Sequence, residues 1–307
     1  MVEKTQSRIR RSAKRIKAHL RHVALTRMPV RLTSGGLTRN RMVRRLGITR
    51  RDIILPDLPD ALDGLRIGHL SDLHVGDLIP PQRLPEIIAA ANGLGADLIA
   101  VTGDLVDLHL KVLPEVVAAL ADLEAPLGVY FVLGNHDHLV DGGQVAAALC
   151  EAGLNLLVNE QRMLDVRGCA IRVSGIDFAH RPLDLTRLVR RAIQPLHQRP
   201  VADLSLLLSH HPDGFDPACR HDVDLTLAGH THGGHFTLFN GRGRKGSLGL
   251  GSLAFRYPRG LYRRGHRYLY VTTGVGSWFP VRFNCPPEIA CLTLRSQADA
   301  AVDLSHP

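Results

Sequence analysis

Five short polar clusters, each following an apolar run, supply the kinds of side chain that bind divalent metals. They are Asp72-Leu73-His74, Gly103-Asp104-Leu105-Val106-Asp107, Gly134-Asn135-His136-Asp137, Ser209-His210-His211-Pro212 and Gly229-His230-Thr231-His232-Gly233-Gly234. Carboxylate oxygens and imidazole nitrogens suit hard and borderline divalent cations. One such cluster is common on a protein surface, but five in one chain predict a mixed Asp, His and Asn metal centre.

The spacing of the clusters supports this prediction. Alternate residues of an extended strand point the same way, so Asp72 and His74 can converge on one ion. The carboxylate of Asp104 has two oxygens and can bridge two cations. Because each cluster follows an expected strand, the five should meet where α/β sheets hold their ligands, at the carboxyl ends of the strands.

The segments that must position the clusters alternate, from residue 64 onward, between short apolar runs and helical patterns. We expect strands at residues 66–71, 97–102, 129–133, 171–174, 204–209, 225–228, 268–272 and 289–294. We expect helices at residues 81–92, 112–123, 143–152 and 183–193. Apolar strands separated by helices predict an α/β fold whose sheets are covered on both sides.

The composition is that of a globular protein. The chain has 307 residues, of which 45% are hydrophobic and 22% charged. No apolar run approaches the roughly 18 residues of a membrane-spanning helix, and the N-terminus lacks the apolar core of a secretory signal. The five cysteines show no C-x-x-C spacing, which argues against a zinc ribbon. We therefore expect a cytoplasmic protein, or one peripheral on the inner face of the cytoplasmic membrane.

Positive charge is concentrated at the start of the chain. Residues 1–51 hold 16 Lys or Arg and one acid, Glu3, a net charge of +15. The other 256 residues hold 22 bases and 28 acids, a net charge of −6, and the two sum to the +9 of the whole chain. We therefore divide the chain into a basic N-terminal arm, residues 1–50, and a domain, residues 51–307. A linker at residues 30–63 leads into an edge strand.

The arm has the periodicity of an amphipathic helix that is capped by Ser7 and stopped by Pro29. Its apolar face holds Ile9, Ala13, Ile16, Leu20 and Val23, and its other faces hold Arg8, Arg11, Lys14, Arg15, Lys17 and Arg21. Such a helix fits an anionic membrane surface, with residues 1–28 in contact. Two alternatives stay open: a solvated tail or a helix packed on its own domain, and a nucleic-acid-binding arm. The lack of aromatic residues for base stacking makes nucleic acid unlikely.

In order and spacing, the five clusters resemble the motifs D-x-H, G-D-x-x-D, G-N-H-D, H-x-P and G-H-T-H of the calcineurin-like metallophosphoesterase superfamily. The resemblance covers residues 64–296 and implies a metallophosphoesterase-type β-sandwich flanked by helices (αββα). It implies one cation held by Asp72, His74, Asp104 and His232. It implies a second cation held by Asp104, Asn135, His210 and His230. Mixed nitrogen and oxygen ligands accept Mn²⁺, Zn²⁺ or Fe ions.

The resemblance also implies a reaction. A hydroxide that bridges the two ions would attack phosphorus and cleave a phosphodiester or a pyrophosphate. His136 would stand beside the phosphorus without binding metal and donate a proton to the leaving oxygen. Asp137 would orient His136. Asp107 is either a hydrogen-bond partner of a ligating histidine or a surface residue that starts a helix.

A narrower resemblance extends through G-H-T-H-G-G, Gly260-Leu261-Tyr262, residues 268–276, Arg282 and Pro286-Pro287-Glu288-Ile289. These segments look like a bacterial branch in which some members are similar to UDP-2,3-diacylglucosamine pyrophosphohydrolases of lipid A synthesis. This implies an amphiphilic phosphate-containing substrate. Arg282, whose guanidinium matches phosphate geometry, and His235, where the branch usually has Gln, are candidate substrate contacts.

Two other functions stay open. A soluble general or nucleotide phosphodiesterase would share every metal ligand and would work equally well without residues 1–50. A non-catalytic scaffold that binds membrane or nucleic acid would carry a metal centre without catalytic activity. The complete ligand set argues against the scaffold.

Overall fold

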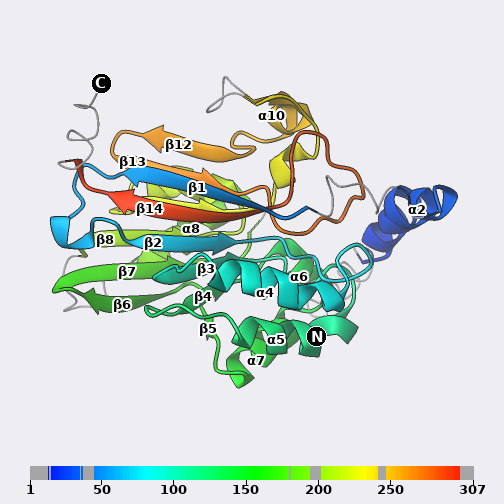
Figure 1. Cartoon of the computed structure of the whole chain (residues 1–307), viewed down its shortest axis with the longest axis horizontal. Helices are drawn as coiled ribbons and strands as arrows, with labels where there is room; N and C mark the ends of the chain where they lie inside the picture. The colour runs from blue at the N-terminus through cyan, green and yellow to red at the C-terminus, as the bar shows by residue number, and fades with distance from the viewer. Residues whose placement is uncertain are drawn as a thin grey trace.

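The computed structural model describes residues 13, 15–34, 36, 45–179, 181–193, 202–240 and 247–297. Within these residues, two six-stranded mixed sheets pack face to face, with helices on the outside (Figure 1). The first sheet has the order β1 (Gly47–Ile54), β14 (Glu288–Arg295), β2 (Arg66–Leu70), β3 (Leu98–Thr102), β4 (Val129–Val132) and β5 (Asn155–Leu156). The second has the order β12 (Gly260–Arg264), β13 (Arg267–Val271), β9 (Leu225–Ala228), β8 (Leu204–Leu208), β7 (Cys169–Gly175) and β6 (Glu160–Val166).

The remaining elements cover the sheets and connect their strands. The helices of the domain are α4 (Leu84–Asn92), α5 (Leu113–Ala121), α6 (Asn135–Val140), α7 (Gly142–Glu151), α8 (Pro182–Ile193), α9 (Phe215–Ala218) and α10 (Leu250–Ala254). The 3₁₀ turns are η2 (Asp60–Leu62), η3 (Pro81–Arg83), η4 (Leu110–Val112), η5 (Pro212–Gly214) and η6 (His232–Gly234). A two-stranded ribbon joins β10 (Thr237–Asn240) to β11 (Ser247–Gly249).

Strand residues alternate between two large cores, as the pleat requires. Val101 and Phe131 pack in the cluster that also contains the apolar faces of α4, α5 and α7. Ala100 and Val132 pack in the cluster between the two sheets. On the far side, α8 packs with Leu207 of β8. The predicted αββα sandwich is confirmed.

All eight expected strands and all four expected helices are present near the expected residues. The elements that the sequence did not predict include β6, β12 and α6. β6 is an edge strand whose exposed residues are Glu160, Arg162 and Asp165, so it has no long apolar run. α6 has six residues, too few to show an apolar period, and it begins inside the G-N-H-D cluster.

The edge strand expected near the start of the domain is β1. It runs parallel to β14, with Gly47 opposite Glu288 and Ile54 opposite Arg295. The expected boundary after residue 50 therefore falls inside a strand. Residues 47–50 already pair with β14 and belong structurally to the domain.

The arm is helical over residues 15–32, and a π-helical turn, η1 (Val23–Arg27), separates its first part from α2 (Met28–Leu32). The expectation that Pro29 stops the helix is wrong. Pro29 lies in the first turn of α2, where its missing N–H needs no partner within that helix. Several residues of the expected pattern lie outside the described residues: Ser7, Arg8, Ile9, Arg11 and Lys14. In the described part of the chain, no helix is both long and apolar enough to cross a membrane.

Candidate metal centre

The five polar clusters follow the carboxyl ends of β2, β3, β4, β8 and β9. β2, β3 and β4 are parallel neighbours in the first sheet, and β8 and β9 are parallel neighbours in the second. A hydrogen bond joins the two sheets here, because Nδ1 of His210 lies 2.7 Å from the main-chain oxygen of Thr102. The ring therefore donates from Nδ1 and presents Nε2 to the site, where Nε2 can carry a proton or, without one, bind a cation.

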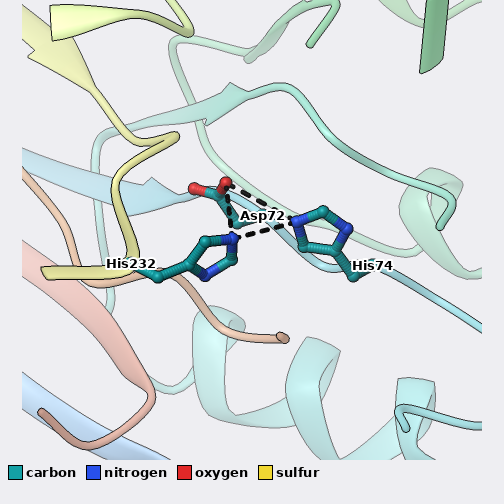
Figure 2. A group of neighbouring side chains, drawn as sticks. All are labelled: Asp72, His74 and His232. Atoms are coloured by element: carbon teal, nitrogen blue, oxygen red, sulfur yellow. Dashed lines mark hydrogen bonds and ion pairs between the residues drawn. The ribbon is translucent and has the colours of Figure 1, made fainter. Parts of the chain in front are cut away.

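A first group of donor atoms comes from Asp72, His74 and His232, which point toward one another in Figure 2. The Nε2 atoms of His74 and His232 are 3.1 Å apart. Oδ1 of Asp72 lies 3.4 Å from Nε2 of His232 and 3.8 Å from Nε2 of His74. All three side chains are buried.

A second group comes from Asp104, Asn135, His210 and His230. Nε2 of His210 lies 3.1 Å from Nδ1 of His230 and 3.0 Å from Oδ1 of Asn135. Asp104 belongs to both groups, because its Oδ2 lies 3.3 Å from Nε2 of His210 and 3.4 Å from Nε2 of His74. The structure thus brings all seven predicted ligands together and places Asp104 between the two groups.

The donor set fits cations. In each group two imidazole nitrogens face each other at 3.1 Å, beside a carboxylate. Facing lone pairs repel unless a proton or a metal ion lies between them, and imidazole with carboxylate suits several divalent metals.

The backbone is held in an unusual conformation at the ligands. Left-handed φ values occur at Asp72 (54°), His74 (46°), Asp104 (54°), His230 (70°) and His232 (49°). Residues other than glycine rarely adopt these values, and such strain concentrates at functional sites. The loops are fixed against each other, since the N–H of Asp72 donates to the oxygen of Gly103 and the N–H of His74 to that of Asp104.

At two positions in the motifs glycine is required, because neighbouring atoms lie too close to leave room for a Cβ. A Cβ at Gly229 would lie 2.0 Å from Oγ of Ser71 and 2.2 Å from Oδ2 of Asp72. A Cβ at Gly134 would lie 2.1 Å from Oδ1 of Asp104. Any larger residue would therefore push a ligating carboxylate out of place.

The carboxylates of the site are held ionised. Burial opposes their charge, yet His74 and His210 outweigh it and hold the pKa of Asp72 and Asp104 well below the ordinary range. Burial would likewise lower the pKa of His74, but Asp107 and Asp72 raise it to about 10. Asp104 raises the pKa of the buried His210 to about 9. Protons on His74 and His210 thus offset the negative charge of the carboxylates. Bound cations would neutralise the same charge.

His136 is held by Asp107. Its Nδ1 lies 3.0 Å from Oδ1 of Asp107 and 3.0 Å from the main-chain oxygen of the same residue. Oδ1 of Asp107 also lies 3.7 Å from Nδ1 of His74. Asp107 is buried, which excludes the surface role. It contacts His136, and its Oδ1 is too far from Nδ1 of His74 for a hydrogen bond to that ligating histidine.

Asp137 differs from the expectation that it orients His136. Its carboxylate accepts the backbone N–H groups of Asp104 and Leu105, each at 2.9 Å, and of Gly134 at 2.8 Å. The reason is its place in the first turn of α6, where an acidic side chain reaches back to N–H groups at the start of the helix. Burial and Asp104 raise its pKa to about 6. Asp137 thus shapes the loop that carries Asp104.

The two candidate substrate contacts lie beside His232. Arg282 is 1% exposed, and its Nη2 lies 3.1 Å from Nδ1 of His232. Its Nη1 donates to the main-chain oxygens of Thr273 and Cys285. His235 stacks on His232 with ring centroids 5.0 Å apart, and burial lowers its pKa to about 3, which keeps it neutral.

The sequence did not indicate that the arm helix reaches the site. Nε2 of the buried His22 lies 2.8 Å from Oδ2 of Asp77, and its Nδ1 lies 3.6 Å from Oδ2 of Asp107. The hydroxyl of Thr26 donates to the main-chain oxygen of Trp278. Of the alternatives for the arm, packing on its own domain is therefore observed over this part of the helix. It packs through polar residues, which hydrophobic periodicity does not reveal.

Phe178 is a second residue that the sequence did not single out. Its ring lies 5.8 Å from that of His210 and 6.0 Å from that of His230. It lies in the loop after β7, next to Asp177, whose Oδ1 lies 2.6 Å from Nε2 of His138. The ring of Phe178 covers one side of the second group of ligands.

Fold and site define a metal-dependent phosphoesterase, and comparison with known families agrees. A family model described as calcineurin-like phosphoesterase matches residues 65–234, more than half of the chain. The chain belongs to that family, and the family and the names of its relatives indicate a metal-dependent phosphoester hydrolase.

Relatives occur in bacteria and in animals. The chain is 32% identical over 250 residues to the uncharacterized metallophosphoesterase YkuE of Bacillus subtilis, a match that spans 78% of this chain and 82% of that protein. It is 30% identical to the uncharacterized metallophosphoesterase Cj0846 of Campylobacter jejuni, over 78% of this chain but 62% of the longer relative. A sulfate thiohydrolase, SoxB, is a solved structure with a TM-score of 0.42 and 16% identity, covering 71% of this chain and 53% of that one.

Proposed function

We propose that the protein hydrolyses a phosphodiester or pyrophosphate bond at a pair of divalent cations. The observation that carries the proposal is the position of Asp104, whose Oδ2 lies 3.4 Å from Nε2 of His74 and 3.3 Å from Nε2 of His210. Two cations bound on either side of it would lower the pKa of a shared water and neutralise charge on the phosphoryl oxygens.

The side chains of the site would then have different roles. Asp72, His74, Asp104 and His232 would hold one cation, and Asp104, Asn135, His210 and His230 the other. His136 would donate a proton to the leaving oxygen, because Asp107 binds its Nδ1 and leaves Nε2 for the substrate.

For the substrate we propose an amphiphilic phosphoester or pyrophosphate, of the UDP-diacylglucosamine type, met at the inner face of the cytoplasmic membrane. Residues 1–28 would lie on the anionic surface. Four large apolar side chains of the arm helix support this, since Ile16, Leu20, Met28 and Leu32 are between 55% and 82% exposed among basic residues. Exposed apolar side chains on a basic helix suit an anionic bilayer surface.

The test is a hydrolysis panel on protein reconstituted with Mn²⁺, Zn²⁺ or Fe²⁺. It compares bis-p-nitrophenyl phosphate, nucleotide pyrophosphates and UDP-diacylglucosamine, each with and without chelator. We expect cleavage that the chelator abolishes and two metal ions per chain. A sample that holds two ions and cleaves none of these bonds would refute the proposal. Flotation with phosphatidylglycerol vesicles, against phosphatidylcholine vesicles, tests the membrane contact.

One observation favours a second candidate, a general or nucleotide phosphodiesterase that acts on soluble substrates. A cavity of about 450 Å³ adjoins the second group of ligands, and its lining includes His211, Arg220 and Arg256. The ring of His211 lies 4.6 Å from that of His230. A polar, charged cavity suits a polar ester group. A higher kcat/KM for nucleotide esters than for the lipid substrate in the same panel would favour this candidate.

A further inference from the structure

A second cavity, of about 300 Å³, lies between the arm helix and the rim of the metal centre. Ile16 and Leu20 line it on the arm side, and Leu108, Leu139 and Val140 line it on the domain side. Leu108 directly follows Asp107, which binds His136. The cavity wall therefore includes Leu108, the next residue in sequence after Asp107, and Asp107 contacts His136, the proposed proton donor.

The helix that carries His136 leads into this cavity. Leu139 and Val140 follow His136 by three and four residues in α6, and residues so spaced share one face of a helix. The apolar wall of the cavity is thus continuous with the face that presents His136 to the site.

The arm supplies the opposite wall with apolar side chains that are poorly covered. Ile16 is 61% exposed and Leu20 is 64% exposed, although the same helix is anchored to the domain through His22 and Thr26. Exposed apolar area beside a hollow is most stable when an apolar group covers it.

Polar residues also line the cavity, and they fit an anionic amphiphile. Arg15, His19 and His109 all contribute to the lining, and the rings of His19 and His109 meet edge to face with centroids 6.2 Å apart. Among the described residues that line it, none is acidic. A ligand with a hydrocarbon chain and a phosphate matches both the apolar walls and this positive charge.

We infer that this cavity binds the hydrocarbon chain of an amphiphilic substrate whose phosphorus lies at the metal centre. The inference rests on the proposed phosphoesterase function and adds the place and the residues of chain recognition. The arm helix is then half of a substrate site, in addition to any contact with a membrane.

The experiment compares ethyl and decyl p-nitrophenyl phosphodiesters on the full-length, metal-loaded protein, both kept as monomers below their critical micelle concentrations. We expect kcat/KM for the decyl ester to exceed that for the ethyl ester at least about tenfold, the gain from burying roughly two methylene groups at about 0.8 kcal/mol each. Leu20→Gln and Leu139→Gln should bring this ratio close to one. Leu20 is exposed, so its replacement should leave the fold intact even if Leu139→Gln destabilises α6.

Leu32→Gln is the matched control, because Leu32 is 82% exposed on the same helix but does not line the cavity. It should keep the wild-type ratio. A wild-type ratio near one, with the ethyl ester still hydrolysed, would overturn the chain site and leave the phosphoesterase proposal standing. If Leu20→Gln and Leu32→Gln lowered the decyl-to-ethyl ratio of kcat/KM equally, the effect would belong to a general apolar or membrane surface. That result would also overturn the chain site. Failure to hydrolyse either ester would count against the phosphoesterase proposal itself.

Discussion

His22 of the arm and Asp107 of the metal centre lie side by side, with Nδ1 of the histidine 3.6 Å from Oδ2 of the carboxylate. The other oxygen of Asp107 lies 3.0 Å from Nδ1 of His136. One residue therefore separates the arm helix from the proposed proton donor. The arm contributes to the surroundings of the reaction as well as to the surface of the molecule.

Replacing His22 by alanine should lower kcat on bis-p-nitrophenyl phosphate while metal content stays near the wild-type value. The reason is that the carboxylate of Asp107 loses its contact with His22 and becomes freer to move. Asp107 then holds the ring of His136 less firmly. The loss should be smaller than the about 10–100-fold expected when the direct partner is altered in Asp107→Asn. Steady-state kinetics and metal analysis measure both. Lys17→Ala, an exposed change on the same helix, is the control, and equal effects of Lys17→Ala and His22→Ala would contradict the coupling.

Replacing His136 by alanine should lower kcat by about 10²–10⁴-fold, the usual contribution of a general acid. Metal content should be retained, because His136 bonds to Asp107 rather than to either group of ligand atoms. Metal analysis of the purified variant decides the point. Loss of metal would show that His136 is itself a ligand.

Gly229→Ala should abolish metal binding and lower the free energy of unfolding by about 1–3 kcal/mol, the usual cost of overpacking. The added methyl would overlap Oδ2 of Asp72, at 2.2 Å, and displace it. Gly47→Ala is the matched control, because the nearest atom to its Cβ would lie at an ordinary 3.4 Å. Metal content and denaturant unfolding of the two variants provide the measurement. Normal metal content in Gly229→Ala would refute the close-approach argument.

Removing the metals should make stability depend on pH above neutrality. The carboxylates raise the pKa of His74 to about 10 and that of His210 to about 9, both from 6.5. Folded protein then binds more protons than the unfolded chain, so the stabilisation is complete below pH 6.5 and is lost as the pH rises toward the folded values. In chelator, Tm should fall from pH 6.5 to pH 9.

The metal-loaded protein is the comparison for that titration. Bound cations replace the protons on His74 and His210, so its Tm should change much less over the same range. Metal uptake at pH 7 should also release protons, which a pH indicator in weak buffer can detect. If Tm changed with pH in the same way with and without metal, the assignment of these protons to His74 and His210 would be contradicted.

The presence of a metal site at these strand ends could be predicted because its chemistry is local. Asp104 lies one glycine after the buried strand β3, and His230 closely follows β9, so residue type and position in the pattern indicated a metal site. The assignment of each residue to one of two cations came from the family resemblance. The α/β fold followed from the same apolar runs, since strands buried on both faces are recognisable without any partner. The arrangement of two sheets in a sandwich followed from the family resemblance.

The supporting contacts could not be predicted because they join residues far apart in the sequence. Nothing near His22 shows that it will face Asp77 and Asp107, and the apolar periodicity of the arm suggests a different buried face. The sequence predicted Asp137, and not Asp107, as the residue that orients His136. Only the structure shows that Asp137 turns toward backbone N–H groups while Asp107 meets the ring.

The pairing of β1 with β14 determines the order in which the molecule can be completed. The arm helix and β1 are translated before their partners, since Thr26 and the residue that it contacts, Trp278, are 252 positions apart in the sequence. Domains fold largely as their sequences emerge. During synthesis the basic segment therefore remains without these contacts until the strands between the partners have been translated.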